Sequence, residues 1–116
     1  MRSGIVTSPL FRQQCYIGGQ WLDGDEWIEV DNPWTCEIIG RVPRLGGEHT
    51  ALAIDAAARA LPAWRQLSAA QRAVPIRRWG ELLQEHRDLL GALMTLEQGK
   101  PLAEACGEID YAASFL

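Results

Sequence analysis

The feature that most constrains the fold is a change of pattern at Gly46. Before it, residues 15–45 consist of short stretches rich in Val, Ile, Tyr and Trp, separated by Gly, Asp and Pro, which is typical of short β-strands. After it, residues 46–116 repeat apolar side chains every three or four positions, which is the period of amphipathic α-helices. The sequence therefore predicts an α+β chain in which a short β-hairpin and strands precede about four helices.

The region before Gly46 divides at its turns. Residues 1–14 carry no regular pattern, so we expect a flexible N-terminal arm. A Gly-Gly pair at 18–19 and an Asp-Gly-Asp run at 23–25 have turn chemistry between strand-like residues, which predicts a hairpin. The Asn-Pro pair at 32–33 interrupts it, and a third strand is expected at 37–42.

Breaks in the helical part define its elements. Pro62 is expected to close the first helix, and Ser68 with Gln71 predicts a capping box at the start of the second. Pro75 lies about two turns inside that helix, where it removes one hydrogen bond and is expected to kink it. Gly99 suits a left-handed cap at the end of the third helix. The predicted apolar stripes are Ala51, Ile54, Ala58 and Leu61; Ile76, Trp79 and Leu83; Leu89, Leu93 and Leu96; and Leu102, Ala105, Ile109, Ala112 and Leu116.

The stripe of the last helix is still running at Leu116, with no Gly, Asn or basic cluster to cap it. Two interpretations stay open: the helix ends uncapped, or the chain belongs to a longer protein. In both, an exposed apolar patch is expected near residues 102–116, and such patches usually contact a partner. We therefore expect a homo-oligomer or association with further protein through this patch.

Composition excludes several functional classes. Of the 116 residues, 47% are hydrophobic and 22% charged, which favours a folded domain over a disordered one. The net charge of −4, with dispersed basic residues, argues against a nucleic-acid partner. No apolar run is long enough for a signal peptide or a membrane span, so we expect a soluble cytoplasmic protein without a membrane partner. The odd number of cysteines, Cys15, Cys36 and Cys106, predicts reduced thiols.

No residue pattern identifies an active site. Only His49 and His86 could act as a base for a cysteine, and structural thiols with surface histidines are the favoured interpretation. Gly99 and Lys100 lack the other glycines and the Ser or Thr of a phosphate-binding loop. Acidic residues on the last helix have no histidine beside them, which favours a solvated face. A monovalent cation held by carbonyl oxygens leaves no mark on composition, so this alternative stays open.

Several segments together resemble one family. They are "LFRQQCYIGGQWLDG", "DNPWTCEIIGRVPRLG", "AIDAAARALPAWRQLSAAQRA", "IRRWGELLQEHRDLLGALMTLEQGKPLAEA" and "GEIDYAASF". From about residue 10 to residue 116 the sequence resembles the N-terminal part of the aldehyde dehydrogenase superfamily. Within it, the bacterial succinate-semialdehyde dehydrogenases are most similar, and the glutarate-semialdehyde dehydrogenases are close neighbours.

The resemblance implies a longer subunit with a Rossmann-like cofactor domain, of which residues 15–116 would be an incomplete N-terminal portion. In this family a cysteine thiolate attacks the aldehyde, hydride passes to NAD or NADP, and a glutamate assists hydrolysis of the thioester. Those residues belong to later family segments, so we expect no catalytic or cofactor-binding residue here and a chain that is inert alone. The implied reaction is succinate semialdehyde to succinate. The alternative is a free-standing interaction module that self-associates or docks on a full-length relative through its last helix.

The resemblance also implies a cation site and two unusual positions. In many members Na+ or K+ is held by carbonyl oxygens at the positions of Val30 and Asp31 and by a carboxylate at the position of Glu97. Trp34 stands where the family has a small residue, and Cys36 stands where it has a glycine, so a backbone position that suits glycine carries a side chain here.

Overall fold

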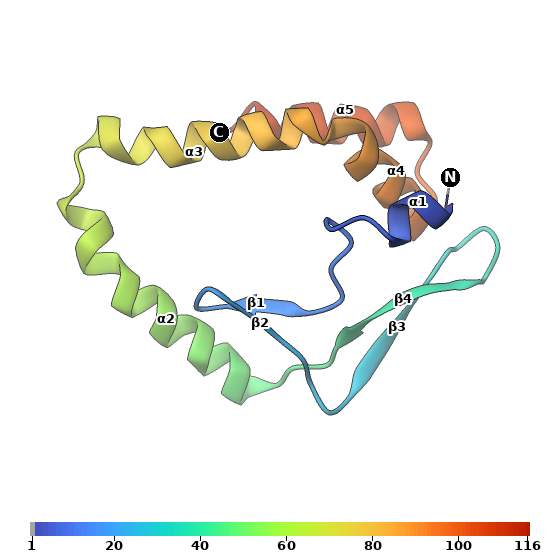
Figure 1. The fold of residues 1–116 in the computed structure, drawn as a ribbon, viewed down its shortest axis with the longest axis horizontal. Helices are drawn as coiled ribbons and strands as arrows, with labels where there is room; N and C mark the ends of the chain where they lie inside the picture. The colour runs from blue at the N-terminus through green and yellow to red at the C-terminus, as the bar shows by residue number, and fades with distance from the viewer. Residues whose placement is uncertain (1) are drawn as a thin grey trace.

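The computed structural model describes residues 2–116, and side chains from residue 4 onward. Figure 1 shows an open arrangement, with the helices forming a bent arm around two small sheets. In chain order the elements are α1 (Arg2–Val6), β1 (Cys15–Ile17), β2 (Gln20–Leu22), β3 (Trp27–Asp31), β4 (Ile38–Pro43), α2 (Gly47–Gln66), α3 (Ala69–Glu85), α4 (Arg87–Gln98) and α5 (Leu102–Ala113). The predicted α+β order of short strands followed by four helices is confirmed.

The strands form two antiparallel hairpins rather than one sheet. β1 and β2 pair across Gly18 and Gly19, whose φ angles of 59° and 86° give the turn the twist that a two-residue hairpin needs. β3 and β4 pair with a bulge between Val30 and Asp31. The prediction of a hairpin is therefore confirmed at Gly18 and Gly19. The turn at residues 23–25 does not close a hairpin, because β2 and β3 do not pair, and the third predicted strand, β4, pairs with β3 instead.

The helix ends follow local chemistry. The Ser68 hydroxyl accepts a hydrogen bond from the backbone N–H of Gln71, and the Gln71 side chain accepts one from the N–H of Ser68. This confirms the capping box. Gly99, with a φ of 75°, confirms the left-handed cap of α4. Pro62 does not close the first helix as expected, because α2 continues through it to Gln66: one lost hydrogen bond is tolerated among good helix formers.

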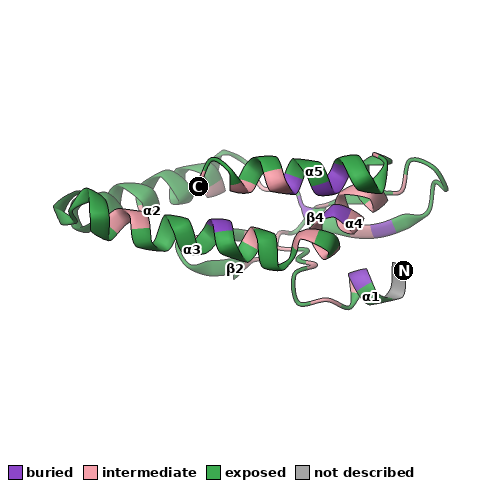
Figure 2. Ribbon diagram, turned by 90° about the horizontal axis from the view of Figure 1, so that it is seen from above, coloured by how far each residue is buried: buried purple, intermediate pink, exposed green. Residues whose placement is uncertain are grey.

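The buried residues gather at one end of the molecule, on α5 and the elements beside it (Figure 2). The buried apolar residues of the described part are Ile5, Ile39, Ala105, Cys106 and Ile109. Because α5 packs on α3 and α4, the stripe of the last helix is covered within the chain at its centre. The prediction of an exposed patch on this stripe is wrong there, and the large apolar side chains of residues 102–116 that are exposed are Leu102, Tyr111 and Phe115.

A helical glycine makes this packing close. A β-carbon at Gly91 would lie 2.6 Å from the Sγ atom of Cys106 and 3.2 Å from its backbone N and Cα atoms. Gly80 of α3 approaches the end of the chain in the same way, since a β-carbon there would lie 3.3 Å from the Cβ atom of Leu116. The absence of a side chain at these two glycines thus allows α5 to approach α4 and the end of the chain to approach α3.

Two further expectations are corrected by packing. Residues 2–6 form α1 instead of an irregular arm, because Ile5 is buried and lines a pocket with Ala92 and Leu96 of α4. The expected burial of Ile76 and Trp79 on α3 is wrong, since both are exposed. Nor does α2 contain any buried residue, although its stripe of Ile54 and Leu61 has the predicted spacing. Among residues 4–116, no element buries the large apolar side chains of these two stripes.

Candidate functional site

The candidate cation site begins at the bulge of the second hairpin. Val30 pairs with Gly40 and Asp31 with Ile38, so the strand opposite skips one residue between these two pairs. A bulge interrupts the regular ladder and redirects the backbone groups beside it. The two carbonyl groups expected to bind a cation therefore lie where the backbone departs from ordinary strand geometry.

The carboxylate of the candidate site is on α4. Glu97 is exposed as a whole residue, yet partial burial of its carboxylate raises its pKa. Among residues 4–116 no side chain or backbone group pairs with this carboxylate. Loss of solvation without a partner disfavours the charged form, and a nearby cation would reverse that effect.

A direct contact joins the two elements that carry these groups. Pro33, two residues after Asp31, lies against Gly99, two residues after Glu97: a β-carbon at Gly99 would be 3.1 Å from the Cγ atom of Pro33. The structure thus brings the hairpin turn against the corner between α4 and α5. The candidate donors are two carbonyl oxygens, of Val30 and Asp31, and the carboxylate of Glu97. Oxygen donors are the type that hard cations such as Na+ and K+ prefer, so the chemistry of these residues fits such an ion.

Asn32, which the sequence predicts only as part of a strand break, organises the turn. Its side-chain oxygen accepts hydrogen bonds from the N–H groups of Trp34 at 2.9 Å and Thr35 at 3.4 Å. Its carbonyl accepts from the N–H of Cys36 at 2.7 Å, and its own N–H donates to the carbonyl of Glu37 at 2.9 Å. Asparagine before proline is a recognised sequence mark of such a turn.

Cys36 adopts the left-handed conformation in this turn, with a φ of 56°. It is the one non-glycine residue with positive φ among residues 2–116. An L-residue is strained there, and glycine is not. The expectation that this position suits glycine is therefore confirmed by the backbone.

A pocket of 340 Å³ lies beside the same turn, between α1, Trp34 and the α4–α5 corner. Its lining is mainly apolar, and the Thr95 hydroxyl within it is buried without a hydrogen-bond partner in the described residues. Lys100 forms an ion pair with Glu108 of α5, which holds the corner in place. Trp34 is 89% exposed and contributes little packing.

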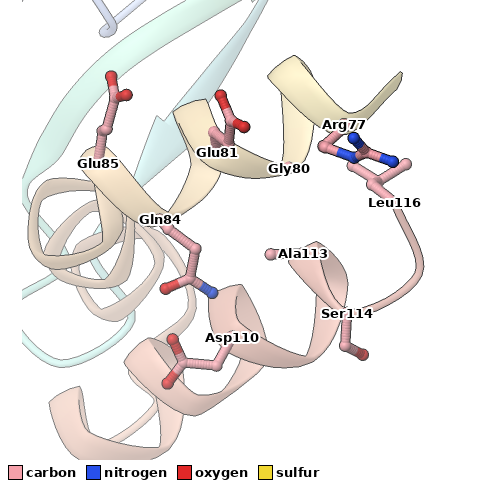
Figure 3. Close-up of a pocket in the computed structure, with 9 residues that line it drawn as sticks. All are labelled: Arg77, Gly80, Glu81, Gln84, Glu85, Asp110, Ala113, Ser114 and Leu116. Atoms are coloured by element: carbon pink, nitrogen blue, oxygen red, sulfur yellow. The ribbon is translucent and has the colours of Figure 1, made fainter. Parts of the chain in front are cut away.

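A second groove, of 510 Å³, separates α3 from the end of α5 (Figure 3). Figure 3 shows Gln84 extending toward Asp110, whereas Glu81 and Glu85 point away from α5. Each carboxylate already has a cationic partner: Arg78 pairs with Glu81 and Glu85, and Arg87 with Asp110. These ion pairs lower the pKa of Asp110 and of Glu85, so the groove has no unpaired acid that could bind a metal.

The three cysteines lie apart from one another, and none of them is hydrogen-bonded to a histidine within the described residues. Cys15, Cys36 and Cys106 lie on β1, in the turn after β3 and inside the α4–α5 contact. No group of three or more His, Cys, Asp or Glu side chains in the described part could hold a metal ion. Both sheets of the described residues are antiparallel hairpins, so these residues contain no pair of parallel strands joined by a crossover helix, the unit on which dinucleotide-binding folds are built.

Comparison with known proteins decides the family. A sequence model described as the aldehyde dehydrogenase family matches residues 21–116. The chain belongs to this family. It is 60% identical to a glutarate-semialdehyde dehydrogenase of Pseudomonas putida and 59% identical to the NADP(+)-dependent succinate-semialdehyde dehydrogenase of Escherichia coli, each over 97% of this chain and 24% of the relative.

Solved structures of aldehyde dehydrogenases share the fold. A crystal structure of succinate-semialdehyde dehydrogenase from Burkholderia pseudomallei matches with a TM-score of 0.90 and 49% identity, over 94% of this chain and 23% of that chain. An aldehyde dehydrogenase from Brucella melitensis gives the same TM-score at 44% identity. The chain therefore spans about a quarter of the length of these aldehyde dehydrogenases and corresponds to their N-terminal portion. No helix of residues 2–116 combines the length and apolar character that crossing a membrane requires.

Proposed function

We propose that this chain serves as the N-terminal portion of an NAD(P)-dependent semialdehyde dehydrogenase that oxidises succinate semialdehyde to succinate. The observation that carries the proposal is the identity of 59–60% to semialdehyde dehydrogenases over 97% of the chain. Glutarate semialdehyde is the alternative substrate. The relative named for glutarate semialdehyde and the relative named for succinate semialdehyde differ by only one percentage point in their identity to this chain. NAD and NADP are both compatible with the proposal.

In this proposal the chain supplies structure and the remaining polypeptide supplies the reacting groups. Within the described residues no cysteine is hydrogen-bonded to a histidine and no two strands are parallel, which supports the expectation that the chain alone is inert. The family's chemistry needs a thiolate, a hydride acceptor and a hydrolytic base in one site. Such a site would form only together with later segments of a dehydrogenase.

The test is a chimera in which residues 1–116 replace the matching segment of the E. coli succinate-semialdehyde dehydrogenase. The isolated chain and the chimera are assayed with both semialdehydes and both cofactors by the absorbance of the reduced nicotinamide. We expect no turnover by the isolated chain and oxidation of succinate semialdehyde by the chimera. A folded chimera without activity, or an isolated chain with activity, would refute the proposal.

We infer further that Na+ or K+ binds between the carbonyl groups of Val30 and Asp31 and the carboxylate of Glu97. The bulge, the contact of Pro33 with Gly99 and the raised pKa of Glu97 support this site. A cation there would tie the second hairpin to the end of α4, which is a structural role.

We also propose a cytoplasmic protein that assembles as an oligomer once joined to the rest of a dehydrogenase. The alternative of an interaction module acting through the last helix loses its main surface, because Ala105, Cys106 and Ile109 are already buried. Size-exclusion chromatography of the chimera, compared with the E. coli enzyme, tests the assembly: a monomeric chimera would contradict it.

A further inference from the structure

The chain exposes far more surface than a compact protein of its mass. Its accessible area is 8349 Å², whereas about 6,300 Å² is expected for a folded monomer of 12.9 kDa. Its radius of gyration is 16.7 Å with extents of 49 × 35 × 19 Å, against about 13 Å for a compact chain of this length. Roughly 2,000 Å² of surface is therefore available to be covered.

The largest uncovered element is α2. This helix has 20 residues and none of them is buried. Ile54 is 63% exposed, Leu61 51% and Trp64 39%. At 3.6 residues per turn these three side chains lie within about 80° of one another around the helix. We call them the α2 face.

A matched position lies on the other side of the same helix. Leu52 is 50% exposed, close to the value for Leu61. Nine residues separate the two, which places Leu52 about 180° away around the helix. A partner that covers the α2 face therefore need not touch Leu52.

Helix physics indicates that the α2 face is covered in the working protein. Most of the stability of a protein helix comes from burial of an amphipathic face, and α2 has no buried residue within the described chain. Within the described residues, the β1–β2 hairpin approaches α2 at Ala56, which lies beside Gly18. Ala56 projects from a side of the helix other than that of Leu61. The three large apolar side chains are thus left for a partner.

Size and similarity identify the partner. Each side of an ordinary protein interface buries about 800 Å², and much larger areas are typical of obligate association; the excess here is of the obligate kind. The same fold occurs in dehydrogenases at a TM-score of 0.90, where it makes up 23% of the chain. We propose that the α2 face docks onto the remaining polypeptide of a semialdehyde dehydrogenase, the roughly three quarters of the relatives' length that this chain does not match. This inference rests on the proposed function, because it takes its partner from it.

The test uses the E. coli chimera described above and the isolated 116-residue chain. Each carries Leu61→Asp, Leu61→Ala, Leu52→Asp or Leu52→Ala. In the chimera, Leu61→Asp should lower the soluble yield at least roughly threefold relative to Leu52→Asp, because it buries an unpaired charge. Leu61→Ala, which keeps the protein measurable, should lower the temperature of inactivation relative to Leu52→Ala. In the isolated chain the helical circular dichroism should be equal for the Leu61 and Leu52 variants.

Each outcome supports or overturns the docking proposal. A chimera that tolerates Leu61→Asp as well as Leu52→Asp overturns it, and so does an unsubstituted chimera that fails to fold. If the isolated chain forms dimers that Leu61→Asp alone breaks, the α2 face binds a second copy and the proposal is again wrong. A folded chimera that is sensitive at Leu61 but oxidises neither semialdehyde supports docking and rejects only the proposed function. An active chimera that is insensitive to substitution of Leu61 supports the proposed function and rejects docking through the α2 face.

Discussion

Replacing Gly91 by alanine should destabilise the α4–α5 contact. The added methyl group would meet the Sγ atom of Cys106 at 2.6 Å and its backbone N and Cα atoms at 3.2 Å. The sulfur could move by a change of rotamer, but the backbone atoms could not move without shifting α5. The substitution therefore forces two packed helices apart beside Ala105, whose exposed fraction is 0%.

Two opposing effects set the magnitude. Alanine in place of glycine stabilises a helix interior by about 1 kcal/mol, because it restricts the unfolded chain. Overpacking of a tight contact costs about 1–3 kcal/mol. Gly107 of α5 provides the control, since a β-carbon there meets nothing within 4 Å. Gly107→Ala should therefore show the stabilisation of the helix by alanine without any cost of overpacking. The free energies of unfolding of the two variants should then differ by about 1–3 kcal/mol.

Urea unfolding of the chain, followed by circular dichroism, measures this difference. We expect a lower midpoint for Gly91→Ala than for Gly107→Ala at the same slope. Adding Cys106→Ala to Gly91→Ala should recover part of the loss, since it removes the closest atom but leaves the backbone contacts. Equal midpoints for the two glycine variants would show that α4 and α5 are not in close contact at Gly91, and the packing argument would fail.

Three further predictions concern the turn and the ion pairs. Cys36→Gly should raise the free energy of unfolding by up to about 1 kcal/mol, because relief of 1–2 kcal/mol of left-handed strain exceeds the entropy cost of glycine; Cys36→Ser, which keeps the Cβ atom, should give no gain in the same urea titration. Asp110→Asn should make stability less dependent on pH in the acid range. Arg87 lowers the pKa of Asp110, so the ion pair stabilises the fold at pH values above the pKa of the unfolded state, and this stabilisation is lost as the pH falls through the pKa of the folded state. A thermal melt series across the acid range that is unchanged by Asp110→Asn would contradict this. Glu97 has a raised pKa, so its charged form costs stability as the pH rises; K+ or Na+ should raise the melting temperature of the chain more than that of Glu97→Gln, whereas tetramethylammonium at equal ionic strength should not.

Local features of the fold could be predicted from the sequence because their causes are local. The capping box needs only Ser68 and Gln71 three residues apart, and the end of α4 needs only a residue that accepts a φ of 75°. The turn at residues 18–19 follows from two adjacent glycines. In each case the atoms that form the contact belong to a few neighbouring residues.

The partner of each helix face could not be predicted in this way. The stripe of α5 has the correct spacing, but spacing alone does not tell whether α4 or an absent segment covers it. The decisive residue is Gly91, whose missing side chain admits Cys106. A single glycine inside a helical pattern carries little information until its neighbour across the contact is known.

The candidate cation site shows the same division. Asn32 and Pro33 mark a turn from their types alone, and the strain at Cys36 follows from a left-handed backbone position that normally favours glycine. The bulge at Val30 and the desolvation of Glu97 depend on how strand and helix meet, so they were visible only in the structure. The resemblance to the family supplied these residues where the chemistry of the sequence could not.

These contacts divide the chain into a closed end and an open end. At the closed end, α4 and α5 pack through Gly91, Arg87 and Lys100 form ion pairs with α5, and Pro33 of the second hairpin lies against Gly99. At the open end, α2 lies exposed with no residue buried. Since burial is what stabilises a helix in a protein, α2 should gain most when further polypeptide covers it. Hydrogen exchange should therefore slow more in α2 than in α5 on going from the isolated chain to the chimera, and equal slowing in both would show that the partner covers the whole chain evenly.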